Sequence, residues 1–226
     1  MSLSTGALRT TLFVDYQNMY RTAREAFGWE AFGGRYGNFR PYSLGRQVAR
    51  GENRVLTEVR VYTGIHTPQR NGVQHAQMQR RMEAWVAASP DIVQVFPRAL
   101  RYSADRPPQE KGVDVELAVD LVSLALDDAF DVVVLASTDT DLVPALQLVA
   151  DRFPKKIIET LAYAPIEGGI ANAALDLPRG AVRRRLVTPR EFQRIADRTN
   201  FYDSASNRAS ALDPERVKRI RGRYSP

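Results

Sequence analysis

The 226-residue sequence contains no cysteine, which excludes disulfide bridges, thiolate zinc sites and cysteine nucleophiles together. Its two histidines, His66 and His75, have no partner at the spacing of a metal site or a catalytic dyad, which favours structural or surface roles for both. Long apolar runs are also missing, because no stretch approaches the roughly 20 apolar residues that cross a membrane. The first residues do not have the pattern of a secretion signal. We therefore expect a soluble, cytoplasmic protein without a membrane partner.

Short motifs of several enzyme classes are absent as well. The sequence has no GxxxxGK[ST] phosphate loop, no GxGxxG after its first expected strand and no GxSxG elbow. A phosphatase of the haloacid dehalogenase type usually has a second aspartate two residues after its nucleophile. Gln17 stands at that distance from Asp15. The chemistries that depend on these motifs are therefore disfavoured.

The most informative stretch that is present is DVVVLASTDTDLVP, residues 131–144. Residues 132–135 are aliphatic without alternation, as in a strand that is buried on both faces of a parallel sheet. Pro144 fits the first turn of a helix, so the polar residues 137–141 fall between the carboxyl end of a strand and the start of a helix. Ligands of open α/β sheets bind in that crevice. The stretch therefore predicts a ligand site that contains Asp139 and Asp141.

The rest of the chain alternates expected strands and helices. We expect strands at residues 8–14, 55–63, 92–96, 131–136, 156–164 and 181–187, with Gly64 closing the second. The first helix is expected to start after a cap at Asn18 or Gln17 and to end at Phe27. Further helices are expected at residues 42–50, 68–88, 111–126, 141–153, 168–175, 188–198 and 213–221. The alternation predicts an α/β fold with a doubly wound, mainly parallel sheet and helices on both faces, a three-layer α/β/α arrangement. We expect a main domain at residues 1–165, an extension of the same domain at 166–198 and a basic polar tail at 199–226.

Charge is distributed unevenly along the chain. Residues 111–178 carry 12 acidic and 4 basic side chains, whereas residues 179–226 carry 13 basic and 5 acidic ones. A solvated helix face explains part of the acidic segment, and a solvated tail is the default for the basic one. Basic flanks around an acidic pocket also suit a protein that attracts a polyanion and holds divalent cations.

Three groups of carboxylates are expected to meet at one edge of the sheet. Asp15 ends the first strand, the pair Asp139 and Asp141 follows the fourth, and Asp114 lies in the first turn of the helix before it. If the first and fourth strands are neighbours, these groups converge at the point where the strand order reverses. Crowded carboxylates oppose one another's ionisation unless a cation lies among them. Ligands that are oxygen atoms only favour Mg²⁺ or Mn²⁺, which can activate water and stabilise a phosphodiester transition state.

Three segments carry a resemblance to a known family. VDYQNMY (14–20), KGVDVELAVD (111–120) and LASTDTDLVP (135–144) resemble, in order and spacing, the motifs of NYN domains. These belong to the PIN-like nuclease superfamily and include bacterial LabA-like proteins. The resemblance covers about residues 8–165 and implies a PIN-like, Rossmannoid fold with a metal-dependent ribonuclease site. The residues that fall on the family's acidic positions, and would hold Mg²⁺ or Mn²⁺, are Asp15, Asp114, Asp139 and Asp141.

Further motif positions have more open roles. Asn18 matches the asparagine of the first motif, where it can orient a ligand or water. Asp120 matches a later acid of the helix and either supports the ligands or forms a structural salt bridge. Ser137 and Thr138 bind phosphate or cap the helix, and Lys111 supports the ligands or contacts phosphate. Thr138 departs from the family, whose third motif often has glycine at this position, and can narrow the approach of a phosphate to the backbone.

The loop at residues 28–41 contains aromatic and basic side chains that can bind RNA, although aromatics that hold the loop to the body of the protein are the favoured interpretation. The candidates are Arg35, Tyr36, Phe39 and Arg40. We expect a ribonuclease acting on single-stranded RNA. The alternative is an inactive RNA-binding or regulatory module on the same fold, and a phosphatase of small phosphoesters ranks third. The sequence leaves open whether the protein forms a homo-oligomer.

Overall fold

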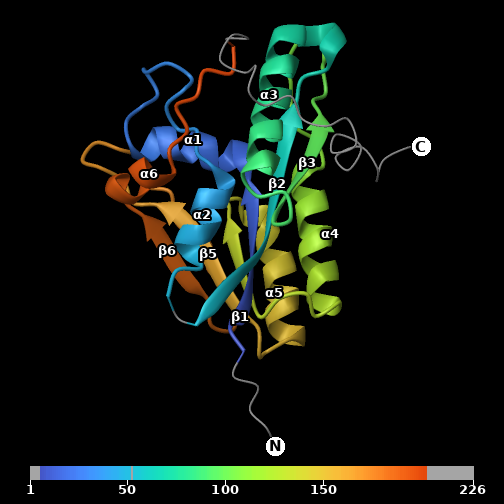
Figure 1. Cartoon of the computed structure of the whole chain (residues 1–226), viewed down its shortest axis with the longest axis vertical. Helices are drawn as coiled ribbons and strands as arrows, with labels where there is room; N and C mark the ends of the chain where they lie inside the picture. Colours follow the sequence, from blue (N-terminus) through green and yellow to red (C-terminus); the bar gives the residue numbers. More distant parts are fainter. Residues whose placement is uncertain (1–5, 52, 203–226) are drawn as a thin grey trace, which may run out of the picture.

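The computed structural model describes residues 6–51 and 53–202, whose backbone forms a single sheet with helices on both faces (Figure 1). The strands are β1 (Leu8–Asp15), β2 (Arg54–Ile65), β3 (Val93–Ala99), β4 (Val132–Ala136), β5 (Ile157–Tyr163) and β6 (Arg183–Val187). The helices are α1 (Tyr16–Ala26), α2 (Pro41–Val48), α3 (Pro68–Ala88), α4 (Val113–Leu126), α5 (Val143–Arg152) and α6 (Pro189–Ile195), and the 3-10 turn η1 (Thr140–Leu142) precedes α5.

The sheet has the strand order β3-β2-β1-β4-β5-β6, and every neighbouring pair is parallel. The expected doubly wound, mainly parallel sheet is therefore confirmed. β1 pairs with β2 on one side and with β4 on the other, so the order reverses beside β1. The carboxyl ends of β1 and β4 consequently lie next to each other, as the placement of the candidate site requires.

Two apolar clusters, one on each face of the sheet, make the three layers. Along β4, Val132 and Val134 belong to the cluster that α1, α2, α3 and α6 cover, whereas Val133 and Leu135 belong to the cluster under α4 and α5. Successive strand residues point to opposite faces. A strand between two helix layers is therefore apolar at every position, which explains the unbroken aliphatic run of β4.

Several local predictions were wrong. The residues 168–175 are not helical: the segment has no regular structure, and it is held by hydrogen bonds from the Ile170 N–H to the Glu25 carbonyl and from the Thr160 hydroxyl to the Leu175 carbonyl. Gly64 does not close β2, which continues to Ile65. The first helix is capped by neither Asn18 nor Gln17, since the Asp15 side chain accepts a hydrogen bond from the Asn18 backbone N–H. Aspartate is among the favoured caps, and its position at a strand end had suggested only a ligand role.

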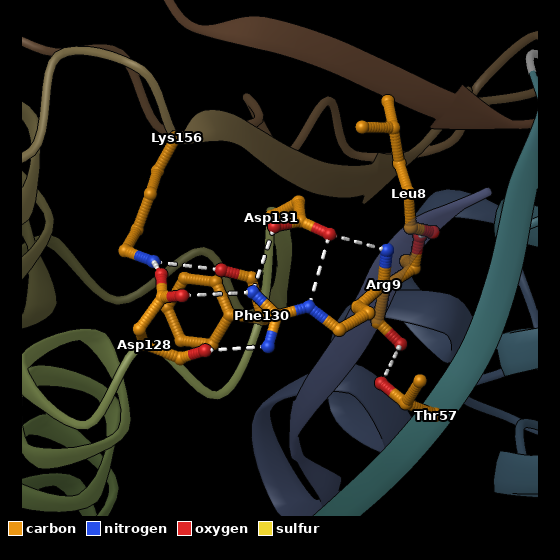
Figure 2. Close-up of polar contacts among 8 residues, drawn as sticks. Leu8, Arg9, Thr57, Asp128, Phe130, Asp131 and Lys156 are labelled. Carbon is orange, nitrogen blue, oxygen red and sulfur yellow. Dashed lines mark hydrogen bonds and ion pairs between the residues drawn. The ribbon is translucent and has the colours of Figure 1, made fainter. Parts of the chain in front are cut away.

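A charged cluster joins the amino ends of three strands (Figure 2). Arg9 of β1 donates from its backbone N–H, Nε and Nη2 to the carboxylate of Asp131, at 2.8, 3.1 and 2.8 Å, and also contacts Asp128. Lys156, just before β5, donates to the Asp128 carboxylate and to the Phe130 carbonyl, both at 2.7 Å. The Arg9 hydrogen bonds are the main cause that lowers the pKa of Asp131. This cluster lies at the end of the sheet opposite Asp15.

The C-terminal part of the described chain completes the sheet edge. β6 pairs with β5, and Thr188 and Glu191 form the expected capping box at the start of α6. The expected helix at 213–221 lies outside the described residues. The boundaries 1–165, 166–198 and 199–226 stay predictions. Within residues 6–51 and 53–202, no helix is long and apolar enough to cross a membrane.

Candidate functional site

The candidate site begins where β1 ends and α1 starts. Asp15 is the last residue of β1, and its side chain is the N-cap of α1, with Oδ1 accepting from the Asn18 N–H at 3.1 Å. Only 8% of Asp15 is exposed. The parallel neighbour β4 ends beside it, because Val14 pairs with Ala136. A buried carboxylate therefore lies at the switch point of the sheet.

Ser137 connects this carboxylate to the third motif. Its hydroxyl donates to Asp15 Oδ2 at 3.2 Å and accepts from the Asp139 N–H at 3.1 Å. Asp139 in turn caps η1, since its Oδ1 accepts from the Asp141 N–H at 3.0 Å. The buried serine therefore holds two of the predicted acids in a fixed relation. With its hydroxyl bound to both, Ser137 supports the site residues rather than offering a free group to phosphate.

Asn18 connects the first and third motifs a second time. Its Oδ1 accepts from both the backbone N–H and the hydroxyl of Thr138, at 3.0 and 3.1 Å. The threonine that stands in the glycine position of the motif therefore uses its side chain inside the site. Its N–H is already bound to Asn18, so this backbone donor is occupied.

Electrostatic interactions connect these acids to the start of α4. Burial raises the pKa of Asp15 to about 6, against the hydrogen bonds from Asn18 and Ser137, and the charge of Asp139 raises it further. Burial also raises the pKa of Glu110 to about 7, and the charges of Asp15 and Asp114 add to that rise. We call this set the carboxylate row; its members are Asp114, Glu110, Asp15, Asp139 and Asp141. Sequence reasoning had missed Glu110.

Glu110 is positioned by the end of β2. Its Oε1 accepts a hydrogen bond from the Gly64 N–H. A Cβ at position 64 would lie 2.5 Å from Oε1 of Glu110 and 2.5 Å from Cδ2 of Leu100, so a larger residue would require these two side chains to move. The signal that could have identified Glu110 is its place directly before the lysine and glycine of the second motif.

The second motif supplies Asp114 and Lys111 to the rim of the crevice. Gly112 is the N-cap residue of α4 with φ +76°, a left-handed conformation that suits glycine, and half-buried Asp114 lies in the first turn of α4. Exposed Lys111 lines an open hollow of about 540 Å³ together with Arg98 and Arg101. This hollow contains no member of the carboxylate row, although Lys111 directly follows Glu110 in sequence.

A further basic residue acts on the carboxylate row from α1. The charge of Arg21 slightly opposes the rise in pKa of both Asp15 and Glu110, while its guanidinium forms an ion pair with Glu25 at 3.8 Å. Its side chain is 69% exposed, so it is also accessible from solvent. Arg21 lies three residues after Asn18, and residues at that spacing share a helix face. That spacing is the signal that sequence reasoning overlooked.

Asp120 lies apart from the carboxylate row. It accepts from Arg60 Nη2 at 2.5 Å and from the Tyr62 hydroxyl at 2.8 Å, both on β2. Of its two predicted roles, these contacts favour the structural salt bridge.

The loop of residues 28–40 is held mainly by Arg24, whose guanidinium donates to four of the loop's backbone carbonyls. Phe39 is fully buried and packs against Tyr16, which excludes it as a candidate for stacking on RNA bases and agrees with the favoured interpretation that loop aromatics hold the loop to the body of the protein. Of the other three candidates, Tyr36 is 39% exposed and Arg35 and Arg40 lie at the surface. Phe32, which is 53% exposed, adds a second accessible ring.

The chemistry of the donor set fits a hard divalent cation, because the carboxylate row offers oxygen atoms only and neighbouring acids add to the raised pKa values of Asp15 and Glu110. The spacing of the acids, in contrast, does not bring three ligands together. Over residues 6–51 and 53–202, no three acidic or histidine side chains form a group close enough to hold a metal ion. The assignment of Asp15, Asp114, Asp139 and Asp141 as ligands stays a prediction.

Comparisons with known proteins give one family and one solved structure. The NYN domain family matches residues 9–173. The crystal structure of a protein of unknown function from Vibrio parahaemolyticus is similar at 19% identity and a TM-score of 0.49, over 74% of this chain and 90% of that chain. A search among curated proteins found no match.

Proposed function

Because the chain belongs to the NYN domain family, we propose that it is a ribonuclease that hydrolyses RNA phosphodiester bonds with a divalent cation, Mg²⁺ or Mn²⁺. The nuclease-type fold of the family favours this chemistry over the others that α/β folds host. Single-stranded RNA is the proposed substrate, because the exposed rings of Phe32 and Tyr36 can stack on unpaired bases.

The observation that carries the proposal is the carboxylate row at the carboxyl ends of β1 and β4. Asp15 and Glu110 have pKa values raised to about 6 and about 7, mainly by burial and in addition by neighbouring acids. Such shifts cluster at functional sites. Grouping ionised carboxylates costs free energy unless a cation joins them, which supports a metal-dependent reaction.

The residues that would hold the cation are Asp15, Asp114, Asp139 and Asp141. The chemistry that a divalent cation would supply there is activation of water and stabilisation of the negative charge on the phosphodiester. Ser137 and Asn18 join the first and third motifs by hydrogen bonds, which would help to hold Asp15 and the loop of Asp139 in place.

Other side chains act on the proton and on the phosphate. Glu110 can hold or release a proton near neutral pH, which suits a group that exchanges protons with water or with the leaving oxygen. Arg21 and Lys111 are exposed basic side chains that lie close in sequence to Asn18 and Glu110. They would bind the phosphates beside the cleaved bond, since basic side chains position nucleic-acid backbones.

The test is a cleavage assay with unstructured and structured RNA of the full chain, with Mn²⁺ or with EDTA. Asp15→Asn and Asp141→Asn are expected to abolish cleavage, as is EDTA, while Asp127→Asn on the exposed end of α4 serves as the matched control. Cleavage that survives both substitutions and chelation would sink the assignment.

A second candidate is an RNA-binding or regulatory module with an inactive site. It is favoured by the open spacing of the acids, since no three of them group as ligands in the described part of the chain. This candidate predicts salt-sensitive RNA binding without Mn²⁺-dependent products. Calorimetry with Mn²⁺ separates the two candidates. A ribonuclease should bind Mn²⁺ with a measurable heat that Asp15→Asn removes, whereas an inactive module should show no such heat.

A further inference from the structure

An open hollow lined by four arginines lies between the end of α2 and the end of α6, which are on the same face of the sheet (Figure 1). Its volume is about 710 Å³. Its arginines are Arg46, Arg50, Arg54 and Arg194, and polar Ser43 and Gln47 also line it. In sequence, residues 40–54 contain four arginines and one acid, Glu52. None of the four arginines that line the hollow lies in the three family motifs.

Three of the four arginines are exposed. Arg46, Arg50 and Arg194 lie at the surface and form no ion pair with a carboxylate of residues 6–51 or 53–202, although the charge of Arg194 helps to lower the pKa of nearby Glu191. Like charges at one hollow repel, so the arrangement is unfavourable until an anion binds. Guanidinium groups match the geometry of phosphate and bind it in a bidentate manner.

The fourth arginine forms a fixed floor. The Arg54 side chain is 2% exposed, and its Nη2 donates to Oε1 of the fully buried Glu159 at 2.8 Å. Arg185 of β6 donates to the other oxygen of Glu159. Arg183 of β6 also lies within ion-pair distance of this carboxylate, so the acid is occupied by three arginines of the strands and does not neutralise the three exposed ones.

The hollow lies far from the carboxylate row. Arg54 pairs with Leu8 at the amino end of β1, while Asp15 stands at the carboxyl end and pairs with Tyr62. The eight residues of β1 span about 25 Å at roughly 3.3 Å per residue. An anion that reaches both places must be long, and a flexible polyanion meets that condition better than a small phosphate ester.

The segment that connects the two places in sequence carries exposed aromatic rings on which bases can stack. α1 begins next to Asp15, and the loop with exposed Phe32 and Tyr36 connects it to α2, which ends at the hollow. Exposed rings between two phosphate-binding regions are typical of surfaces that bind single strands.

We propose that the hollow between α2 and α6 binds phosphate groups of single-stranded RNA several nucleotides away from the bond at the carboxylate row. This proposal rests on the proposed function for its ligand, but it concerns binding and does not require cleavage. The hollow would increase the affinity for long RNA and leave the reaction of short RNA unchanged.

The test compares two triple variants of the full chain in EDTA by fluorescence anisotropy with a 30-nucleotide and a 6-nucleotide uridine-rich RNA. The test variant is Arg46→Gln/Arg50→Gln/Arg194→Gln. The matched control, Arg152→Gln/Lys155→Gln/Arg179→Gln, removes three exposed charges around the end of α5 on the opposite face.

Each phosphate contact adds about 0.7 to the slope of log Kd against log salt for single strands, so the test variant should lose about 2 from the slope with the long RNA. Extrapolated from 1 M salt, that loss weakens binding roughly 50-fold at 0.15 M salt. Binding of the short RNA, and its cleavage in Mn²⁺, should stay unchanged, and the control should bind long RNA like the unmodified chain.

Three results would overturn the proposal: an unchanged slope in the test variant, an equal loss in the control, or an equal effect on the short RNA. Inorganic phosphate that competes at millimolar concentration would assign the hollow to small anions instead. Poly-glutamate bound as tightly as RNA, and lost in the test variant, would assign it to acidic proteins. If no RNA is cleaved but the slope change is found, the ribonuclease proposal fails and this one stands.

Discussion

The Oδ1 atom of Asn18 accepts two hydrogen bonds from Thr138, one from the backbone and one from the hydroxyl, and so ties the start of α1 to the loop after β4. The residue that departs from the family motif is thereby part of the site's framework. The backbone N–H of position 138 donates to the Asn18 side chain, and a glycine there could keep that bond. The hydroxyl bond is specific to threonine or serine.

Replacing Thr138 with glycine tests what the departure does. Thr138→Gly should lower the free energy of unfolding by about 1 to 2 kcal/mol, because a hydrogen bond is lost and the unfolded chain gains freedom. Cleavage should persist, since the backbone bond to Asn18 remains. Urea unfolding and the RNA assay measure both, with Thr138→Ser as the control that keeps the hydroxyl. A higher rate in the glycine variant would show that the threonine side chain obstructs the phosphate.

Neutralising Asp15 should stabilise the metal-free protein in a pH-dependent way. Its pKa of about 6 exceeds the ordinary value, so the folded state binds the proton more tightly than the unfolded chain. The contribution of this carboxyl to stability is therefore greatest below pH 4 and declines as the pH rises through 6, by about 3 kcal/mol in total. Asp15→Asn keeps an oxygen for the helix cap. In EDTA, its stability relative to the unmodified chain should rise by that amount between pH 4 and pH 8, whereas Asp127→Asn should show no such trend.

The affinity for a cation should increase as the pH rises, whereas the contribution of Asp15 to the stability of the metal-free protein declines over the same range. Mn²⁺ binds ionised carboxylates, and Asp15 and Glu110 lose their protons only near pH 6 and 7. At a Mn²⁺ concentration about 100 times Kd, the gain is about 2.7 kcal/mol, or roughly 5 to 10 °C in Tm for a domain of this size. The shift should be large at pH 8 and small at pH 5.5. Glu110→Gln should reduce it and exposed Glu167→Gln should not; an equal shift in all three proteins would exclude Glu110 from the site.

The fold followed from the sequence because its signals are local and repeated. The aliphatic run of β4, the proline at the start of α5 and the capping box of α6 each act within a few residues, and the structure contains all three elements. The adjacency of β1 and β4 needed only the rule that doubly wound sheets reverse their order beside the first strand.

The missing parts of the site depend on contacts between distant segments. Glu110 joins the carboxylate row because Gly64, 46 residues earlier, lets its carboxylate approach the backbone. In the sequence, Phe39 could not be distinguished from the other aromatic residues of the loop, but it is buried where the loop returns to the core. Spacing along the chain contains neither fact, so a sequence motif identifies the acids of a site more readily than the residues that position them.

The contacts of Asp120 lead to the last prediction, which separates a structural acid from a catalytic one. Asp120 binds Arg60 and Tyr62, and the Arg60 side chain is only 5% exposed, packed over the Phe96 ring. Asp120→Asn should lower the free energy of unfolding by about 2 to 4 kcal/mol, because a nearly buried guanidinium loses a charged partner and keeps only Glu58. RNA cleavage at a temperature where the variant is folded should be retained. Urea unfolding and initial rates, with Asp127→Asn as control, measure the two effects. A variant of unchanged stability that no longer cleaves would instead assign Asp120 to the metal site.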